Sequence, residues 1–307
     1  MSHVLVTGGA GFIGSHLVRA LLKNGNKVRV LDNLSTGKRE NISDLDVDLM
    51  VGDIRDLHVV RQAVEEVNLV FHLAAFISVP ASMEEPLVCF DINLMSSINL
   101  LWAACQAGVK RVVLASSAAV YGEIESVVTE ETPLQPLSPY AVSKLAMEQV
   151  ARLFTTSYEL PTVSLRYFNV YGPRQSPDSP YAAVIPLFIR GLLNGKSPMI
   201  HGDGKQTRDF VFVEDVVQAN LLAADREEVS GEVFNIGGGK SVSILEMAQH
   251  LQQLIEDGPP PVFGPPRAGD IRFSEADLSL AEKSLGYRPI IDLKEGLKIT
   301  VQWFQTP

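Results

Sequence analysis

The sequence predicts an α/β fold built on a doubly wound parallel sheet, and three observations support this prediction. Short β-rich runs alternate with longer amphipathic stretches through the first half of the chain. The β-rich runs are apolar nearly throughout, as strands are when helices cover both faces of a parallel sheet. A glycine-rich turn joins the first run to the first helical stretch. Alternation of this kind implies right-handed strand–helix–strand units.

The expected elements follow one another regularly up to residue 170. We expect strands over 3–8, 27–32, 47–53, 69–75, 111–117 and 162–169, and helices over 12–24, 56–66, 85–107, 139–158 and 182–194. Proline and polar residues then become frequent, and the run 255–270 is typical of a loop. The prediction is a domain over 1–169 and a smaller α/β lobe over 170–307, which packs on the carboxyl edge of the sheet and returns some segments to it.

Composition limits the classes of partner. The chain has 307 residues, 46% of them hydrophobic and 20% charged, which is enough for one large domain or two smaller ones. A net charge of −10 argues against nucleic acid, because phosphate binding needs a basic face. Cys89 and Cys105 have no disulfide or metal-site spacing. With no signal peptide and no run near the ~18 apolar residues of a membrane span, we expect a reduced, cytoplasmic, soluble protein.

The run "TGGAGFIG" places Gly8, Gly11 and Gly14 between the first strand and the first helix. A plain tight turn is the alternative, but this context favours a Rossmann-type dinucleotide site whose pyrophosphate rests on the start of the helix. Asp32 ends the second strand, where its carboxylate can accept hydrogen bonds from the adenosine ribose and repel a 2′-phosphate. We therefore expect NAD and not NADP. The expected cofactor-binding set also includes Phe12, Ile13, Asn33, Asp53, Ile54, Ala74 and Ala75.

The run "SPYAVSK" indicates a helix start that carries chemistry. Ser138 can cap the helix and Pro139 suits its first position. Tyr140 and Lys144 then lie one turn apart on a single face, although a surface cation near an aromatic ring is the alternative. Beside bound NAD, Lys144 can hydrogen-bond the nicotinamide ribose, and its charge, with that of the nicotinamide, lowers the phenol pKa from about 10. Tyr140 can then take a proton from a sugar hydroxyl that Ser117, at the end of strand 111–117, hydrogen-bonds.

These motifs give the chain a family resemblance. The sequence resembles the extended short-chain dehydrogenase/reductase family, and within it the nucleotide-sugar epimerases and dehydratases. The motifs "TGGAGFIG", "LDNLSTG", "HLAA", "SSAAVYG", "YAVSK", "RYFNVYGPRQ", "RDFVFVEDV" and "FNIGGG" carry the likeness over essentially the whole chain. The resemblance implies tightly held NAD, a UDP-sugar in the C-terminal lobe, and a homodimer whose four-helix bundle comes from the helices near 85–107 and 139–158.

The residues after Ser117 bear on the reaction. Dehydratases and decarboxylases that the chain resembles carry acidic residues there, because elimination needs another acid and base. This chain has Ala118 and Ala119, and neither can move a proton. Oxidation and re-reduction remain, so we expect epimerisation at carbon 4 of a UDP-hexose. Two alternatives stay open: a net oxidoreductase that releases the reduced cofactor, and a non-catalytic NAD-binding relative.

The resemblance also assigns substrate-binding residues. They are Asn169, Arg208 and Arg267 for the diphosphate, Asp270 for the nucleoside ribose, and the backbone of Ile200 and His201 for uracil. Either arginine taken singly would be read as a surface charge. Only their positions in the motifs favour the assignment.

Two positions bear on the sugar. Epimerases of UDP-glucuronate carry a threonine and an arginine where this chain has Asn169 and Ser176. A buried carboxylate without a cation is costly, so a neutral hexose is favoured, with UDP-glucuronate kept as an alternative because of Arg174. Epimerases restricted to glucose and galactose carry a bulky tyrosine where this chain has Ser274, or Phe273 if the alignment shifts by one. Serine there would leave room for an N-acetylated sugar.

Overall fold

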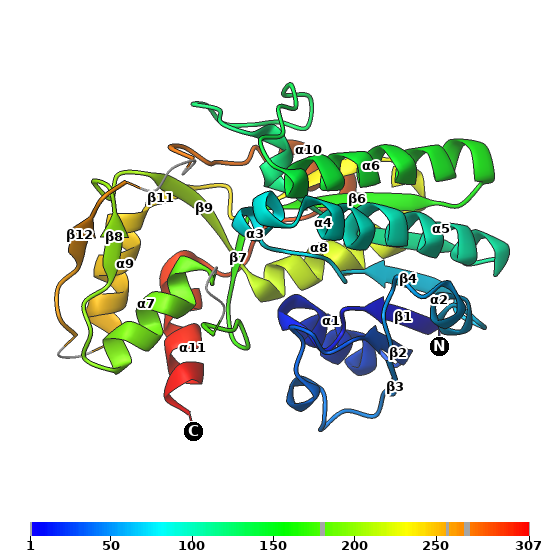
Figure 1. Ribbon diagram of the computed structural model, residues 1–307, viewed down its shortest axis with the longest axis horizontal. Helices are drawn as coiled ribbons and strands as arrows, with labels where there is room; N and C mark the ends of the chain where they lie inside the picture. The colour runs from blue at the N-terminus through cyan, green and yellow to red at the C-terminus, as the bar shows by residue number, and fades with distance from the viewer. Residues whose placement is uncertain (1, 179–181, 256–257, 267–270, 307) are drawn as a thin grey trace.

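A seven-stranded parallel sheet forms the centre of the larger domain (Figure 1). The computed structural model describes residues 2–178, 182–255, 258–266 and 271–306. Along the sheet the strands are β10 (Val233–Ile236), β6 (Thr162–Tyr167), β5 (Arg111–Ser117), β4 (Leu69–His72), β1 (His3–Thr7), β2 (Lys27–Asp32) and β3 (Asp48–Val51). Their order and direction confirm the predicted Rossmann-type, doubly wound fold.

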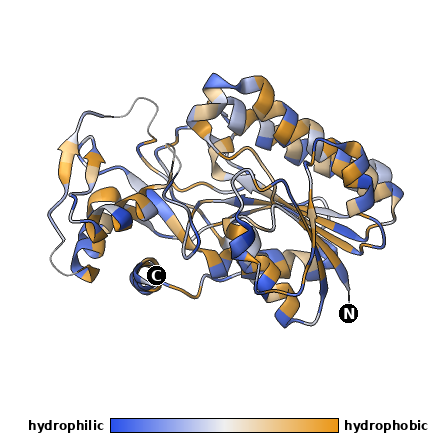
Figure 2. Cartoon of the chain, turned by 60° about the horizontal axis from the view of Figure 1, so that its bottom comes forward, coloured by the Kyte–Doolittle hydropathy of each residue, from blue (hydrophilic) through white to orange (hydrophobic). Residues whose placement is uncertain are grey.

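Helices cover both faces of this sheet. Successive side chains of a strand point to opposite faces, and the side chains on both faces are apolar. Val4 and Val6 of β1 face one core with α1 (Phe12–Lys23), α8 (Val213–Asp225) and α10 (Ser279–Leu285). Leu5 faces the other core with α2 (Leu57–Ala63), α5 (Ser96–Gln106) and α6 (Pro139–Tyr158). In Figure 2 the central strands are largely hydrophobic while the surrounding helices carry both colours. This pattern is the reason the strands read as apolar runs.

The single helix expected over 85–107 is wrong in detail. The chain forms α4 (Pro86–Phe90), a π-helix (Asp91–Met95) and then α5, and the unpredicted α3 (Val79–Glu84) precedes them. Asn93 lies within the π-helix and its side chain binds both the N–H and the C=O of Phe76. Such widened turns occur where a side chain serves a neighbouring segment, here the loop after β4. Three 3₁₀ turns also occur, at Arg39–Asn41, Ala118–Tyr121 and Glu227–Val229.

The same helical run corrects an expectation about membranes. By length and composition the 21-residue stretch Pro86–Gln106 could cross a bilayer, whereas the sequence had indicated no run near that length. Of its most apolar window, 44% is buried inside the protein. Its inner side chains, such as Leu100 and Leu101, belong to the core beside the sheet. This packing is typical of a helix in a folded globular domain.

The second half of the chain builds a smaller lobe with its own core. Its sheets are β11 (Ser241–Ser243), β9 (Thr207–Phe212) and β7 (Asn169–Tyr171) in one, and β8 (Met199–His201) with β12 (Val262–Gly264) in the other. The helices α7 (Val184–Leu193), α9 (Ile244–Leu254) and α11 (Leu293–Gln305) pack together with these strands. The lobe lies beside the carboxyl edge of the large sheet (Figure 1). Strand β10 and helix α8 return to the larger domain.

Two expectations about the second half were wrong. The strand expected over 162–169 stops at Tyr167, and Asn169 begins β7 in a different sheet. The run 255–270 is not only a loop, because β12 pairs in parallel with β8. Its three residues stand between a run of three prolines and a proline pair, and a strand that short gives no periodic signal.

We predict that Gly14→Ala destabilises the protein. A Cβ at Gly14 would lie 2.1 Å from the carbonyl oxygen of Gly8 and 2.7 Å from Cα of Gly9, so α1 would have to move off the sheet. Overpacking of this kind costs about 1–3 kcal/mol in the free energy of unfolding, measurable by urea denaturation. The control is Gly191→Ala in α7, where the nearest atom lies 3.6 Å away and stability should hold or rise. Equal midpoints for wild type and Gly14→Ala would contradict this packing argument.

Candidate active site

The glycine turn after β1 has the geometry that a dinucleotide needs. Gly8 has a φ of +70°, and a Cβ there would lie 2.8 Å from the backbone nitrogen of Ala74. Gly11 precedes α1 and has no side chain with which to cap the first N–H groups of the helix. A pyrophosphate fits such a turn because it accepts hydrogen bonds from these groups and gains from the helix dipole. Phe12 and Ile13 offer their backbone here, while their side chains pack toward the core of the smaller lobe.

Asp32 lies beside this turn at the end of β2. Its side chain is only 7% exposed, and its carboxylate accepts N–H groups from Ala10 at 3.0 Å and Leu34 at 2.8 Å. A Cβ at Gly37 would lie 2.9 Å from Oδ2, so the following loop passes directly over the carboxylate. Each oxygen retains a lone pair for a ribose hydroxyl, and a 2′-phosphate would meet a fixed negative charge. The geometry therefore fits NAD better than NADP.

The other residues expected to bind the adenosine part of NAD come together at the ends of β2 and β3. The Asn33 amide donates to Asp53 at 2.9 Å, and the guanidinium of Arg55 donates hydrogen bonds to both carboxylate oxygens of Asp53. These hydrogen bonds from Arg55 hold the pKa of the Asp53 carboxyl well below its usual range. Ile54 is buried in the apolar core beside α2, so its backbone is what it can offer a ligand.

The expected catalytic residues converge at the end of β5 and the start of α6. Ser138 caps α6 by accepting the N–H of Ala141 at 3.1 Å, which confirms the predicted helix start. The Ser117 side chain lies close to the Tyr140 phenol, and both line one cavity. Lys144 is 4% exposed, and its Nζ donates to the carbonyl of Ala115 at 2.7 Å and lies 6.0 Å from the Tyr140 ring centre. The serine, the phenol and the ammonium thus occupy one small region.

Electrostatics inside the site differ from the simple expectation. Burial raises the pKa of the Tyr140 phenol above its usual value, and the neighbouring Ser117 hydroxyl acts in the opposite direction. Burial also lowers the pKa of Lys144 to about 8. Lys144 alone therefore does not supply the predicted decrease in the phenol pKa. The positive charge of an oxidised nicotinamide, which that prediction also invoked, has to supply it.

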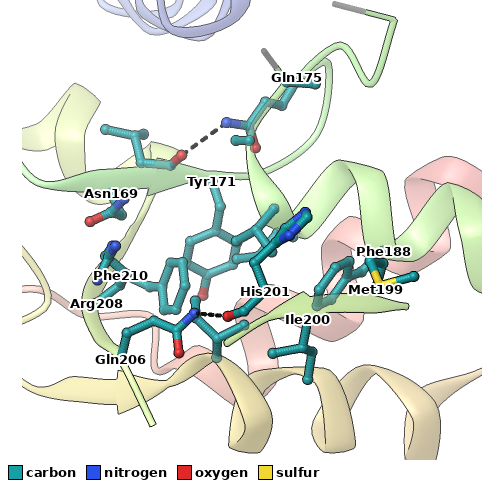
Figure 3. A pocket seen from close by; sticks show the side chains of 16 residues that line it. Asn169, Tyr171, Gln175, Phe188, Met199, Ile200, His201, Gln206, Arg208 and Phe210 are labelled. Atoms are coloured by element: carbon teal, nitrogen blue, oxygen red, sulfur yellow. Dashed lines mark hydrogen bonds between the residues drawn. The ribbon is translucent and has the colours of Figure 1, made fainter. Parts of the chain in front are cut away.

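Two cavities meet next to these residues. One, of about 270 Å³, is lined by Ser117 and Tyr140 and by the alanines that follow Ser117. The other, of about 250 Å³, lies in the smaller lobe and is lined by Ile200 and His201 (Figure 3). Asn169 and Arg208 line both cavities, and they sit on the adjacent strands β7 and β9. A long ligand could thus span both cavities with its middle at these two residues.

The expected substrate residues are only partly brought together. Arg208 donates to the carbonyl of Ile271 at 2.6 Å, which fixes its guanidinium at the junction of the cavities. Ser274 and Phe273 both line the cavity of Ser117, so a shift of one residue would not remove this wall. Arg267 and Asp270 lie outside the residues that the structure describes. Ala74 and Ala75 follow β4 at the same edge of the sheet as the glycine turn.

Sequence reasoning missed several polar residues of the site. Gln206 is buried in the smaller-lobe cavity and donates to the carbonyl of His201 at 2.8 Å, and Gln175 donates to Val170 at 3.0 Å (Figure 3). Glu275 lines the cavity of Ser117, with its carboxylate accepting from Ser241. Gln175 is the last residue of the quoted motif "RYFNVYGPRQ" and Gln206 stands two residues before "RDFVFVEDV", so both could have been found. Glu275 has no such signal.

Comparison with known proteins agrees with this geometry. A family model described as the NAD dependent epimerase/dehydratase family matches residues 4–237. The chain belongs to this family. The UDP-glucose 4-epimerase of Mycolicibacterium smegmatis is 39% identical to this chain over 308 residues, and the alignment covers 98% of each protein. The resemblance read from the motifs is therefore confirmed.

Two solved structures of the epimerase/dehydratase family are similar over nearly the whole chain. The UDP-glucose 4-epimerase of Thermotoga maritima, determined with UDP-glucose, has a TM-score of 0.94 at 40% identity, covering 99% of this chain and 98% of that one. The UDP-N-acetylglucosamine 4-epimerase of Methanobrevibacter ruminantium, in complex with UDP-N-acetylmuramic acid, also has a TM-score of 0.94, at 41% identity and the same coverage. The smaller lobe is thus part of the shared fold.

We predict that Tyr140→Phe abolishes most turnover in this epimerase/dehydratase. The change removes the phenol that lies near Ser117 in the cavity, while the ring keeps its packing. Loss of a general base lowers the rate by about 10²–10⁴-fold, measured as kcat with UDP-glucose. Retained NAD, read from the absorbance spectrum of the purified variant, is the control for folding. Near-normal turnover would show that Tyr140 is not the base.

Proposed function

We propose that the protein catalyses NAD-dependent epimerisation at carbon 4 of a UDP-hexose. One observation carries this proposal: the cavity that holds Ser117 and Tyr140 joins a second cavity in the smaller lobe at Asn169 and Arg208. The sugar would occupy the first cavity, the diphosphate the junction, and the uridine the second. The glycine turn and Asp32 would hold NAD at the carboxyl edge of the sheet.

The side chains support a reaction of oxidation and re-reduction. The glycine turn and Asp32 would hold NAD, which would supply reversible hydride transfer to and from the two faces of carbon 4. Tyr140 would take the proton of the 4-hydroxyl and give it back after the sugar has turned over. Ser117, which lines the same cavity as the phenol, would orient that hydroxyl. Lys144 would bind the nicotinamide ribose and hold the phenol beside it.

The cavity offers little support for elimination. Ala118 and Ala119 line it at the positions where an additional acid and base would be needed. Glu275 is the carboxylate that lines the same cavity, and its Oε2 is occupied by the N–H and hydroxyl of Ser241. A carboxylate held in this way is a poor proton shuttle. Epimerisation therefore remains the preferred reaction.

A neutral sugar is favoured over a uronate. Arg174, the cation that kept UDP-glucuronate as an alternative, approaches His16 of α1 at 3.3 Å and is absent from the described lining of both cavities. Glu275 adds a negative charge to the wall that a uronate carboxylate would face. Two like charges in one cavity repel each other, which costs binding energy. Ser274 on the same wall supports acceptance of N-acetylated sugars as well.

The proposed function predicts products of unchanged mass. The protein would be incubated separately with UDP-glucose, UDP-N-acetylglucosamine and UDP-glucuronate, and the products followed by NMR and mass spectrometry. We expect UDP-galactose from UDP-glucose, the N-acetylated counterpart from the second, and little turnover of the uronate. Loss of water or carbon dioxide would refute epimerisation. Stoichiometric release of NADH would indicate a net oxidoreductase instead.

We predict that Ser274→Tyr separates the two neutral substrates. The ketosugar must present both faces to Tyr140, so the cavity has to hold two poses, and an acetamido group needs extra volume in at least one of them. A tyrosine ring would fill that volume, lowering kcat/KM for UDP-N-acetylglucosamine more than tenfold, about 1.4 kcal/mol, while largely sparing UDP-glucose. Ser274→Ala, which adds no bulk, is the matched control. Equal losses on both sugars would mean that the residue shapes only the loop.

We also propose that the protein is a homodimer through a four-helix bundle. Apolar side chains are exposed along the adjoining helices α4, α5 and α6, among them Leu87 at 83% and Leu153 at 50% exposure. Val142 and Leu153 are eleven residues apart on α6 and Met95 and Trp102 seven apart, so each pair lies on one side of its helix. A second copy would cover this apolar surface, as expected for large exposed patches.

The dimer proposal predicts that one charge on this surface separates the subunits. Leu153→Glu would bury a carboxylate against apolar side chains of the partner, a large penalty for association. The mass measured by light scattering during size-exclusion chromatography should fall from two chains to one. Ile290→Glu, at a residue that is 72% exposed on the smaller lobe, is the control and should leave the mass unchanged. A wild-type protein of single-chain mass would refute the dimer.

The cytoplasm is the proposed location. Cys89 and Cys105 are both free thiols, and Cys89 is fully buried. Proteins with unpaired cysteines are typical of reducing compartments. The net charge of −10 supports a small-molecule substrate and argues against nucleic acid as a partner.

A further inference from the structure

Two consecutive residues near the end of β5 are hydrogen-bonded to α6. The carbonyl of Ala115 accepts from Lys144, and the hydroxyl of Ser116 donates to Oε1 of Glu148. Ser117, which follows them, lines the same cavity as Tyr140. Tyr140, Lys144 and Glu148 are four residues apart in turn, so they form one stripe along the helix. The first two have roles in the proposed mechanism. Glu148 does not.

The buried carboxylate of Glu148 is held by several hydrogen bonds. Glu148 is 2% exposed, and Arg166 of β6 is buried beside it. The guanidinium of Arg166 donates two hydrogen bonds to the carboxylate, from Nε to Oε1 at 2.9 Å and from Nη2 to Oε2 at 2.7 Å. Burying such a pair costs desolvation, and apolar residues of similar volume often stabilise a core as well or better. Stability alone therefore gives no reason for a charged pair at this position.

The pair is connected to the sugar cavity through one aromatic residue. Nη1 of Arg166 donates to the Tyr121 hydroxyl at 2.9 Å, and its guanidinium lies 4.9 Å from the centre of the Tyr121 ring. That hydroxyl donates to Asn235 of β10 at 2.6 Å, while the backbone N–H of Asn235 donates to Glu130. Tyr121 lines the cavity of Ser117. The network therefore extends from the catalytic helix to the sugar-binding wall.

Glu148 also differs in charge from the other groups that face Lys144. Cys89 of α4 has its thiol pKa raised by burial, and His72 of β4 has its pKa lowered to about 3 by burial and by Lys144. Both are therefore neutral near pH 7, as is the phenol of Tyr140 without a cofactor. Burial is the main cause that lowers the pKa of Lys144, and Cys89 and then the carboxylate of Glu148 act in the opposite direction by raising it.

We propose that Glu148 is a positioning residue that, paired with Arg166, fixes the rotation of α6 against β5 and places a negative charge one helical turn from Lys144. Because this proposal rests on the catalytic roles proposed for Tyr140 and Lys144, the test must separate the two. The measurement is the pH profile of kcat with UDP-glucose. Its acidic limb reports loss of the Tyr140 proton and its alkaline limb reports loss of the Lys144 proton.

Glu148→Gln removes the negative charge and leaves that of Arg166. The added positive potential lowers the pKa of both Tyr140 and Lys144. Both limbs should therefore move to lower pH, by about one unit for one charge near the site. Ser116→Ala is the matched control, because it removes a hydrogen bond to Glu148 but no charge, and its limbs should stay in place.

Arg166→Met is the second variant. Its pH profile of kcat provides the test if Glu148→Gln does not fold. It leaves the carboxylate without its cation, so both limbs should move to higher pH. A lower kcat with unmoved limbs in either variant would overturn the proposal and leave a purely structural pair. If Tyr140→Phe keeps its turnover, the proposed function fails first. An inactive Tyr140→Phe with unmoved limbs in Glu148→Gln refutes the positioning role alone.

Discussion

The parallel register of the large sheet is the constraint on which the candidate site depends. Thr7 of β1 pairs with Leu31 of β2 and with His72 of β4, and His72 pairs with Leu114 of β5. The strands therefore end at nearly the same level, and the groups that follow them meet at one edge. The glycine turn, Asp32, Ala74 and Ser117 all stand just after or at such an end. A shift of one strand by one residue would turn its side chains to the opposite face and separate these groups.

Beneath that edge the protein keeps polar groups that are fully paired. The Thr7 hydroxyl bonds to Nδ1 of His72 at 2.8 Å, and Nε2 of His72 bonds to Ser97 at 2.8 Å. Ser97 donates to the carbonyl of Asn93, whose side chain holds both backbone groups of Phe76. Unpaired polar groups would be costly at this depth, whereas paired ones fix rotamers and loops. This chain of contacts holds the loop after β4 beside the glycine turn.

The sequence predicted the parts of the fold that depend on local pattern. Apolar strands, the glycine turn and the capped start of α6 at Ser138 each follow from neighbouring residues, and the structure has them where they were expected. The π-helix around Asn93 and the change from one sheet to another at Phe168 depend on contacts between residues distant in sequence, so no local pattern indicates them. Likewise the Ser117, Tyr140 and Lys144 motif was readable, whereas Glu275 reaches the cavity only through tertiary packing.

The sheet switch at Phe168 limits how the two halves of the site can move. Between Tyr167 of β6 and Asn169 of β7 a single residue links the two sheets, and its N–H is bonded to Ile236 of β10 at 2.9 Å. Phe168 is also buried, which leaves the backbone there no free joint. Hinges need residues that can absorb changes in backbone angles. The backbone at this crossing therefore offers no hinge between the walls around Tyr140 and Asn169, which favours inversion at carbon 4 by rotation of the sugar itself within the cavity.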